Sequence, residues 1–224
     1  MIKADHISKS FDGRVVLDDV SVEFDTGTTN LVIGKSGSGK TVLLKCLVGL
    51  HEVDSGSIWY DDIDFTALGF KERKAIRRDI GMLFQGSALF DSETVLGNVM
   101  FPLKMFTDNP LSEIRDRAMF CLERVNLKGA ENKFPSEISG GMQKRVAIAR
   151  AIVNDPEIVL ADEPTGALDS ETSIQVMQLL KQIAKDRLVI MVTHNPNLAD
   201  KYSSRIVRLL DGQVIEDTLS LIHI

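Results

Sequence analysis

The chain has 224 residues, a formal net charge of −6 and a pI near 5.3. This length supports a well-buried core, and we expect one globular unit. The acidic balance argues against nucleic acid as the main partner, because phosphate-backbone binding needs a basic face. Cys46 and Cys121 lie in apolar helical patterns without C-x-x-C spacing, which is typical of reduced core residues in a cytosolic protein. No apolar stretch approaches the length needed to cross a bilayer, so any membrane role is expected to be peripheral.

The first third of the chain carries strand signals. Val20–Phe24 alternates apolar and polar residues like a half-buried strand, and the next turn leads to the apolar run Leu31–Ile33. Ser57–Tyr60 is predicted to be a further strand. Residues 71–78 form a charged, helix-like stretch. We therefore expect a β-rich layer joined to the loop that follows Leu31–Ile33.

A phosphate-binding loop is the most informative motif. Residues 34–41 fit G-x-x-x-x-G-K-[ST] at every fixed position, directly after Leu31–Ile33 and before the helix-like run Val42–Leu50. The glycines let consecutive backbone N–H groups curl around an anion, and the helix points its positive end at it. Lys40 can reach the outer phosphates, and Thr41 can offer its hydroxyl to Mg²⁺. The predicted phosphate-binding residues are Gly34, Lys35, Ser36, Gly37, Ser38, Gly39, Lys40 and Thr41.

The middle of the chain is predicted to be helical. Ile80–Phe84 suits a short buried strand that ends at Gln85, a candidate ligand of Mg²⁺ or of the lytic water. From residue 86 to residue 154 the apolar residues keep helical spacing, and strand signals are absent. We interpret this stretch as a helical insertion.

The last third returns to strands. Ile158–Ala161 and Leu188–Val192 are continuous apolar runs, the pattern of parallel strands covered on both faces, with a predicted helix over residues 170–186 between them. The order favours an α/β fold: a P-loop NTPase with a mainly parallel sheet core, an antiparallel β subdomain and a helical insertion. The expected layout is one nucleotide-binding domain over residues 1–218, with the β-rich layer and core in 1–85 and 155–218, a helical subdomain in 86–154, and a tail, appended or artefactual, in 219–224.

Acidic residues follow the Ile158–Ala161 run. Asp162 is a candidate ligand of Mg²⁺ through a bound water, because this small hard ion keeps several waters and takes few carboxylates. Glu163 is a candidate general base for the attacking water. His194 follows the next strand and can donate toward the γ-phosphate or the attacking water, although a lone histidine there also suits a structural role. The expected catalytic residues are Glu163, His194, Lys40 and Gln85.

A second helix start that suits an anion lies in the helical insertion. It precedes the predicted helix Lys144–Ile152 and consists of Ser139, Gly140, Gly141 and Met142. One nucleotide does not need two such cradles from the same subunit. We therefore expect a head-to-tail dimer, in which this segment covers the γ-phosphate held by Lys40 of the partner subunit. Phe11 is a candidate to stack on adenine, and a core position suits it equally.

Together these motifs resemble the ATP-binding subunit of ABC transporters over about residues 1–217. The corresponding motifs are Walker A (34–41), the Q-loop (Gln85), the signature (138–142), Walker B (158–163), the D-loop with Asp169 (167–169) and the switch histidine (His194). Ile138 and Met142 replace the commoner Leu and Gln, but the small Ser-Gly-Gly is intact. The resemblance implies ATP and Mg²⁺ as cofactors, with Asp169 at the nucleotide site. It also implies a second copy and a transmembrane permease as partners, at the inner face of the cell membrane.

The subfamily signals differ between the two halves. Residues 81–90 and 98–103 resemble ATPases of bacterial phospholipid-trafficking systems, whereas residues 161–169 and 192–196 resemble lipoprotein-releasing and macrolide-exporting ATPases. Either the chain is an intermediate branch or it joins pieces of two genes. Both resemblances imply lipids, lipoproteins or amphipathic compounds as cargo. The alternative function is a soluble ABC ATPase in a non-transport role such as iron–sulfur cluster assembly.

Overall fold

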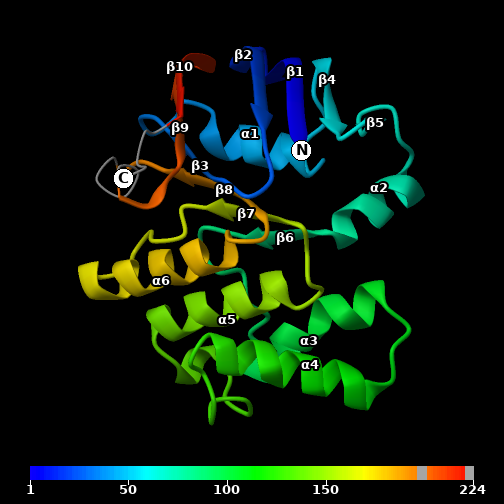
Figure 1. The fold of residues 1–224 in the computed structure, drawn as a ribbon, viewed down its shortest axis with the longest axis vertical. Helices are drawn as coiled ribbons and strands as arrows, with labels where there is room; N and C mark the ends of the chain where they lie inside the picture. Colours follow the sequence, from blue (N-terminus) through cyan, green and yellow to red (C-terminus); the bar gives the residue numbers. More distant parts are fainter. Residues whose placement is uncertain (196–200, 220–224) are drawn as a thin grey trace. The chain divides into compact units, whose positions relative to one another are not determined.

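The computed structural model describes residues 1–195 and 201–219. These residues form two compact units (Figure 1): unit 1 contains residues 1–77 and the described residues from 181 onward, and unit 2 contains residues 78–180. Of the expected tail, residues 220–224 lie outside the described residues. No helix among the described residues is long and apolar enough to span a bilayer.

Unit 1 contains the predicted antiparallel layer. Its strands run in the order β2 (Arg14–Phe24), β1 (Ile2–Phe11), β4 (Ser55–Tyr60) and β5 (Ile63–Asp64), and each neighbouring pair is antiparallel. One face of this sheet is buried, because apolar side chains alternate with polar ones along the strands. Its buried residues include Ile2, Ala4, Leu17, Val20, Val22, Phe24 and Ile58.

Unit 1 also contains parallel strands. β3 (Thr29–Ile33) pairs in parallel with β8 (Leu188–Thr193) on one side and with β9 (Arg205–Leu210) on the other. β9 returns through a tight turn into β10 (Gln213–Leu219), and the two strands form an antiparallel hairpin. β3 and β8 are buried along their whole length, as the continuous apolar runs predict.

Two helices belong mainly to unit 1. α1 (Lys40–Leu47) follows the phosphate loop and packs on β8 and β2, with Leu43, Leu44 and Leu47 buried. α2 (Phe70–Arg78) buries none of its residues, which agrees with its charged sequence.

Unit 2 combines two parallel strands with a helical part. β6 (Ile80–Leu83) pairs in parallel with β7 (Ile158–Asp162). α3 (Val95–Phe106), α4 (Leu111–Arg124) and α5 (Gly140–Ile152) pack against one another, and α5 also packs on β6 (Figure 1). A short 3₁₀ turn (Pro135–Glu137) precedes α5, and α6 (Ser170–Ile183) begins in this unit. The predicted helical insertion is therefore present.

Candidate nucleotide-binding site

The phosphate loop connects β3 to α1. It bends at Gly37 and Gly39, whose φ angles of 81° and 97° lie in the left-handed region that favours glycine. The side chain of Lys40 is buried, and its Nζ donates to the carbonyl oxygens of Gly34 (2.8 Å) and Lys35 (2.9 Å). The ammonium group therefore spans the loop, with the backbone wrapped around it.

The loop has little room for side chains. A Cβ atom added to Gly34 would clash with the carbonyl oxygen of Leu209, and one added to Gly39 would lie 2.7 Å from the carbonyl oxygen of Val16. The Oγ of Ser38 is buried without a hydrogen-bond partner among the described residues. A buried hydroxyl needs a partner, and a phosphate oxygen can supply one. The loop therefore fits the phosphate group that its sequence predicts.

Two further candidate residues lie in unit 1. Ile33 pairs with Thr193 in the parallel register of β3 and β8, so Gly34 and His194 follow neighbouring positions at the same edge of the sheet. His194 is exposed. Phe11 ends β1 with 38% of its surface exposed, and its ring meets that of His51 edge-on at 5.1 Å. Phe11 is thus accessible rather than a core residue.

Unit 2 brings Gln85, Asp162 and Glu163 together. Leu83 pairs with Ala161 in the parallel register, so the residues after both strands emerge at one edge. Asp162 and Glu163 are 3% and 8% exposed, and Glu163 has a left-handed φ of 46°. A Cβ atom on Gly166 would contact both the Glu163 carbonyl oxygen (3.3 Å) and Cγ of Gln85 (3.9 Å). Non-glycine residues with a left-handed backbone, such as Glu163, are concentrated at functional sites.

The signature segment and Asp169 also lie side by side in unit 2. Ser139 caps α5, and its Oγ accepts a hydrogen bond from the Met142 backbone N–H (3.3 Å). A Cβ atom on Gly141 would lie 2.7 Å from Cγ2 of Thr172. Thr172 in turn donates from its backbone N–H (2.9 Å) and its hydroxyl (2.6 Å) to the Asp169 carboxylate, and these hydrogen bonds lower the pKa of Asp169.

Two buried cations of α5, Lys144 and Arg150, were not predicted from the sequence. Nζ of Lys144 donates to the carbonyl oxygens of Gln85 (2.7 Å) and Phe84 (3.2 Å), and Arg150 contacts the same segment further along. Burial lowers the pKa of Lys144 to about 8, against the attraction of Asp162. A detectable signal was the spacing of Lys144, which falls on the same helix face as the buried Ile148.

An apolar cavity of about 390 Å³ lies between β6 and α3. Phe90 and Phe101, each 40% exposed, line it with their ring centroids 4.7 Å apart. Asn98, which is fully buried, holds the backbone of Phe90 from α3. The other apolar lining residues include Ile80, Met82, Phe84, Pro102 and Phe106.

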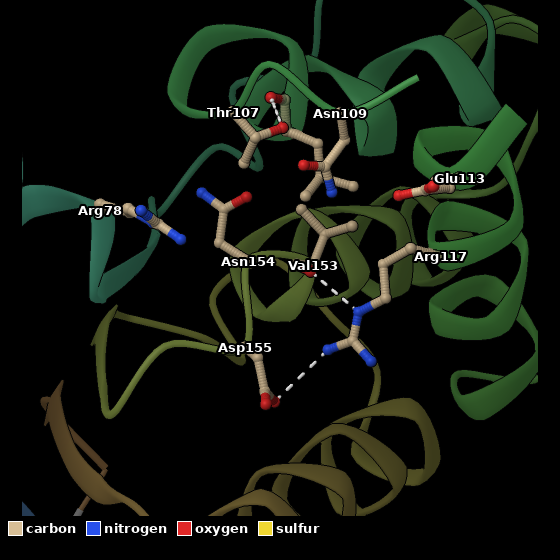
Figure 2. A pocket seen from close by; sticks show the side chains of 9 residues that line it. Arg78, Thr107, Asn109, Glu113, Arg117, Val153, Asn154 and Asp155 are labelled. Carbon is tan, nitrogen blue, oxygen red and sulfur yellow. Dashed lines mark hydrogen bonds and ion pairs between the residues drawn. The ribbon is translucent and has the colours of Figure 1, made fainter. Parts of the chain in front are cut away.

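A second cavity of about 340 Å³ has a polar lining (Figure 2). Figure 2 shows Arg117 reaching from α4 toward the end of α5, where Nε donates to the Val153 carbonyl oxygen (3.0 Å) and Nη2 pairs with Asp155 Oδ1 (3.4 Å). Asn154 borders both cavities. The two hollows therefore adjoin along the end of α5.

The sequence model of the ABC transporter family matches residues 17–166. The chain belongs to the ABC transporter family. It is 42% identical over 200 residues to a probable ribonucleotide transport ATP-binding protein of Mycobacterium leprae. This alignment covers 88% of the present chain and 58% of the relative. The chain is 36% identical over 224 residues to a methionine import ATP-binding protein of Rhodopseudomonas palustris, with coverage of 96% and 60%. The ABC chain thus spans about three fifths of the length of these curated relatives.

Solved ABC cassettes share this fold. A dimeric ATP-binding cassette in a post-hydrolysis state, bound to ADP and Pi, matches with a TM-score of 0.89 and 36% identity over 98% of both chains. CbiO1 of Clostridium perfringens, part of an ABC transporter complex, matches with a TM-score of 0.86 and 27% identity over 97% of this chain and 88% of that one. These likenesses confirm the predicted P-loop α/β fold of an ABC ATPase cassette.

Proposed function

We propose that this chain is the ATP-binding and ATP-hydrolysing subunit of an ABC transporter. The observation that carries the proposal is the placement of reactive groups at strand ends in both units. The phosphate loop and His194 follow paired strands in unit 1, and Gln85 and Glu163 follow paired strands in unit 2. Ligands of α/β proteins bind at the carboxyl ends of parallel strands.

Each candidate residue has a role that suits its chemistry. The backbone of residues 34–41 and the Lys40 ammonium bind the phosphates, and Glu163 accepts a proton from the attacking water. His194 donates toward the γ-phosphate, and Phe11 stacks on adenine. Thr41, Gln85 and Asp162 are the proposed ligands of Mg²⁺, since hydroxyl, amide and carboxylate oxygens are the hard donors that this ion takes. Mg²⁺ would neutralise charge on the phosphates.

A second copy of the chain is the proposed partner at the nucleotide. Ser139 and Gly140 are exposed at the start of α5, and the N–H groups there can meet an anion bound elsewhere. Asp169 lies next to Gly141 through Thr172, so both belong to the same proposed dimer surface. The dimeric state of the similar ADP-bound cassette supports this arrangement.

The proposed second partner is a transmembrane permease that holds the chain at the inner face of the cell membrane. The apolar cavity between β6 and α3 offers exposed aromatic rings to a short permease helix, beside the Gln85 segment. The similar CbiO1 is part of a transporter complex, which supports a permease partner. Lipids, lipoproteins or amphipathic compounds as cargo rest on the motif resemblances, while the relatives are named for methionine and ribonucleotides.

Phosphate release by the purified chain with ATP and Mg²⁺ tests the proposal. We expect steady turnover that falls by about a thousandfold in Glu163→Gln, because the amide cannot accept the proton. Glu157→Gln, at an exposed position before β7, is the matched control and should retain wild-type turnover. Equal rates for wild type and Glu163→Gln would refute the assignment of Glu163 as the base.

A further inference from the structure

Two buried cations of α5 hold the chain segment that follows β6. Lys144 is 2% exposed and donates to the carbonyl oxygens of Phe84 and Gln85, at 3.2 and 2.7 Å. Arg150 is 9% exposed and donates from Nη2 to Ser87 (2.7 Å) and from Nη1 to Ala88 (2.6 Å). Four backbone carbonyls within five residues thus accept hydrogen bonds from one helix.

Two successive residues of this segment have a left-handed backbone that the surrounding contacts must stabilise. Ser87 and Ala88 have φ angles of 61° and 48°, in the left-handed region that non-glycine residues rarely adopt. Successive strained residues persist only where the surrounding contacts fix them. The local turn bonds, from Ser87 N–H to the Phe84 carbonyl oxygen (3.1 Å) and from Ala88 N–H to that of Gly86 (2.7 Å), fix part of the turn. The cations fix the carbonyls that point toward α5.

Lys144 is costly to bury and would not be needed for packing alone. Its neighbours on the same helix face, Ala147, Ile148 and Ala151, are buried and apolar, so an aliphatic side chain would fill this position. An ammonium there is stable only if hydrogen bonds and nearby negative charge compensate for its burial, and Asp162 supplies such a charge. The bonds to Phe84 and Gln85 satisfy two of the three donors, and they connect α5 to the two residues that directly follow the end of β6.

We propose that Lys144 is a positioning residue that ties the backbone of Gln85 to α5, so that Gln85 moves together with the Ser139–Gly141 segment at the start of that helix. The proposal rests on the proposed function, in which Gln85 serves the reaction. Lys144 therefore acts through Gln85 and not on the nucleotide. Arg150 anchors the far end of the same segment.

Hydrogen exchange of the nucleotide-free chain tests the tie without relying on ATP hydrolysis. In Lys144→Met we expect amides of residues 85–88 to exchange about tenfold faster than in wild type, because local opening no longer breaks two charged hydrogen bonds. Lys144→Arg keeps a cation with donors and should restore slow exchange. Lys128→Met, at an exposed position in the same unit, is the matched control. Unchanged exchange in Lys144→Met would overturn the tie.

Kinetics of a double-mutant cycle test whether Lys144 acts through Gln85. We expect Lys144→Met to lower kcat about tenfold and to change the KM for ATP less than about twofold. The Lys144→Met, Gln85→Ala double variant should lose no more than Gln85→Ala alone, because a residue that acts through another adds nothing once that one is gone. If the fold-losses in kcat of the two single variants multiply in the double variant, the proposal is wrong.

These outcomes separate this inference from the proposed function. A wild-type chain without ATPase activity would contradict the proposed function, while the exchange experiment would still decide whether Lys144 ties the Gln85 backbone. If Lys144→Met does not fold, as judged by its thermal unfolding, Lys144→Gln replaces it. The shorter neutral amide keeps a polar group but does not reach both carbonyls, so the same faster exchange is expected.

Discussion

Asn98 and Phe90 form a pair of reciprocal hydrogen bonds. Oδ1 of Asn98 accepts from the Phe90 backbone N–H at 2.8 Å, and Nδ2 donates to the Phe90 carbonyl oxygen at 3.1 Å. Nδ2 also lies within hydrogen-bond distance of the carbonyl oxygens of Thr94 (3.0 Å) and Glu93 (3.2 Å). One buried amide thus shapes the loop that presents the Phe90 ring to the apolar cavity.

We predict that Asn98→Ala lowers the free energy of unfolding by about 3 kcal/mol, because part-buried backbone groups of Phe90 lose their partners and the fully buried amide leaves a cavity. Urea unfolding measures this loss. Asn132→Ala, at an exposed position in the same unit, should change the free energy by less than about 0.5 kcal/mol. A loss in Asn98→Ala no greater than in this control would contradict the role given to the amide.

Lys40→Ala should weaken ATP binding by about a hundredfold or more. The ammonium is the proposed partner of the outer phosphates, and charge-assisted bonds to phosphate are strong. Titration calorimetry of the purified chain measures the affinity. Lys71→Ala, on the exposed face of α2, removes the same charge and should bind ATP like wild type. Equal affinity of Lys40→Ala and wild type would exclude Lys40 from the phosphate site.

Glu163→Gln should accumulate as a dimer with ATP and Mg²⁺. The variant still binds ATP but does not remove the γ-phosphate that the second copy would cover. Size-exclusion chromatography with and without ATP detects the change from monomer to dimer. If Glu163→Gln binds ATP and yet elutes as a monomer across the micromolar range, the head-to-tail arrangement is wrong.

Stability should fall in mildly alkaline solution because of Cys46. Burial raises the pKa of this thiol from 9.0 to about 11, so above pH 9 the unfolded chain loses the proton before the folded chain does. The stabilisation is therefore complete below pH 9 and is lost as the pH approaches 11. Between pH 8 and pH 10, wild type should lose about 1 kcal/mol more than Cys46→Ala in urea unfolding. If the free energy of unfolding falls equally with pH in wild type and Cys46→Ala, Cys46 does not cause the loss of stability.

Contiguous motifs were predictable from the sequence, and contacts between distant residues were not. The phosphate loop is specified by eight consecutive residues, and Asp162 and Glu163 directly follow an apolar run that forms β7. Lys144 meets Gln85 only after folding brings together residues 59 positions apart. A lysine is common on the exposed face of a helix, and only the apolar residues on the same face of α5 indicate that Lys144 is buried.

Element boundaries were predicted less well for physical reasons. α5 begins at Gly140, four residues before the predicted start at Lys144. The Ser139 hydroxyl caps the helix there, but the two glycines that follow have low helix propensity, so the sequence did not indicate this start. β1 was not predicted, because its alternation breaks at His6, which has a left-handed φ of 51° and interrupts the pairing with β2. β2 starts at Arg14, six residues earlier than expected.

Thr172 joins the start of α5 to the turn before α6, because it lies against Gly141 and is hydrogen-bonded to Asp169. The γ-methyl group of Thr172 occupies the space that a side chain at position 141 would need, while its hydroxyl and N–H fasten Asp169. The start of α5 and the turn before α6 therefore pack closely against each other. A partner that binds this edge would therefore contact both segments at once, and a bulkier residue at position 141 would clash with Thr172 and push the two segments apart.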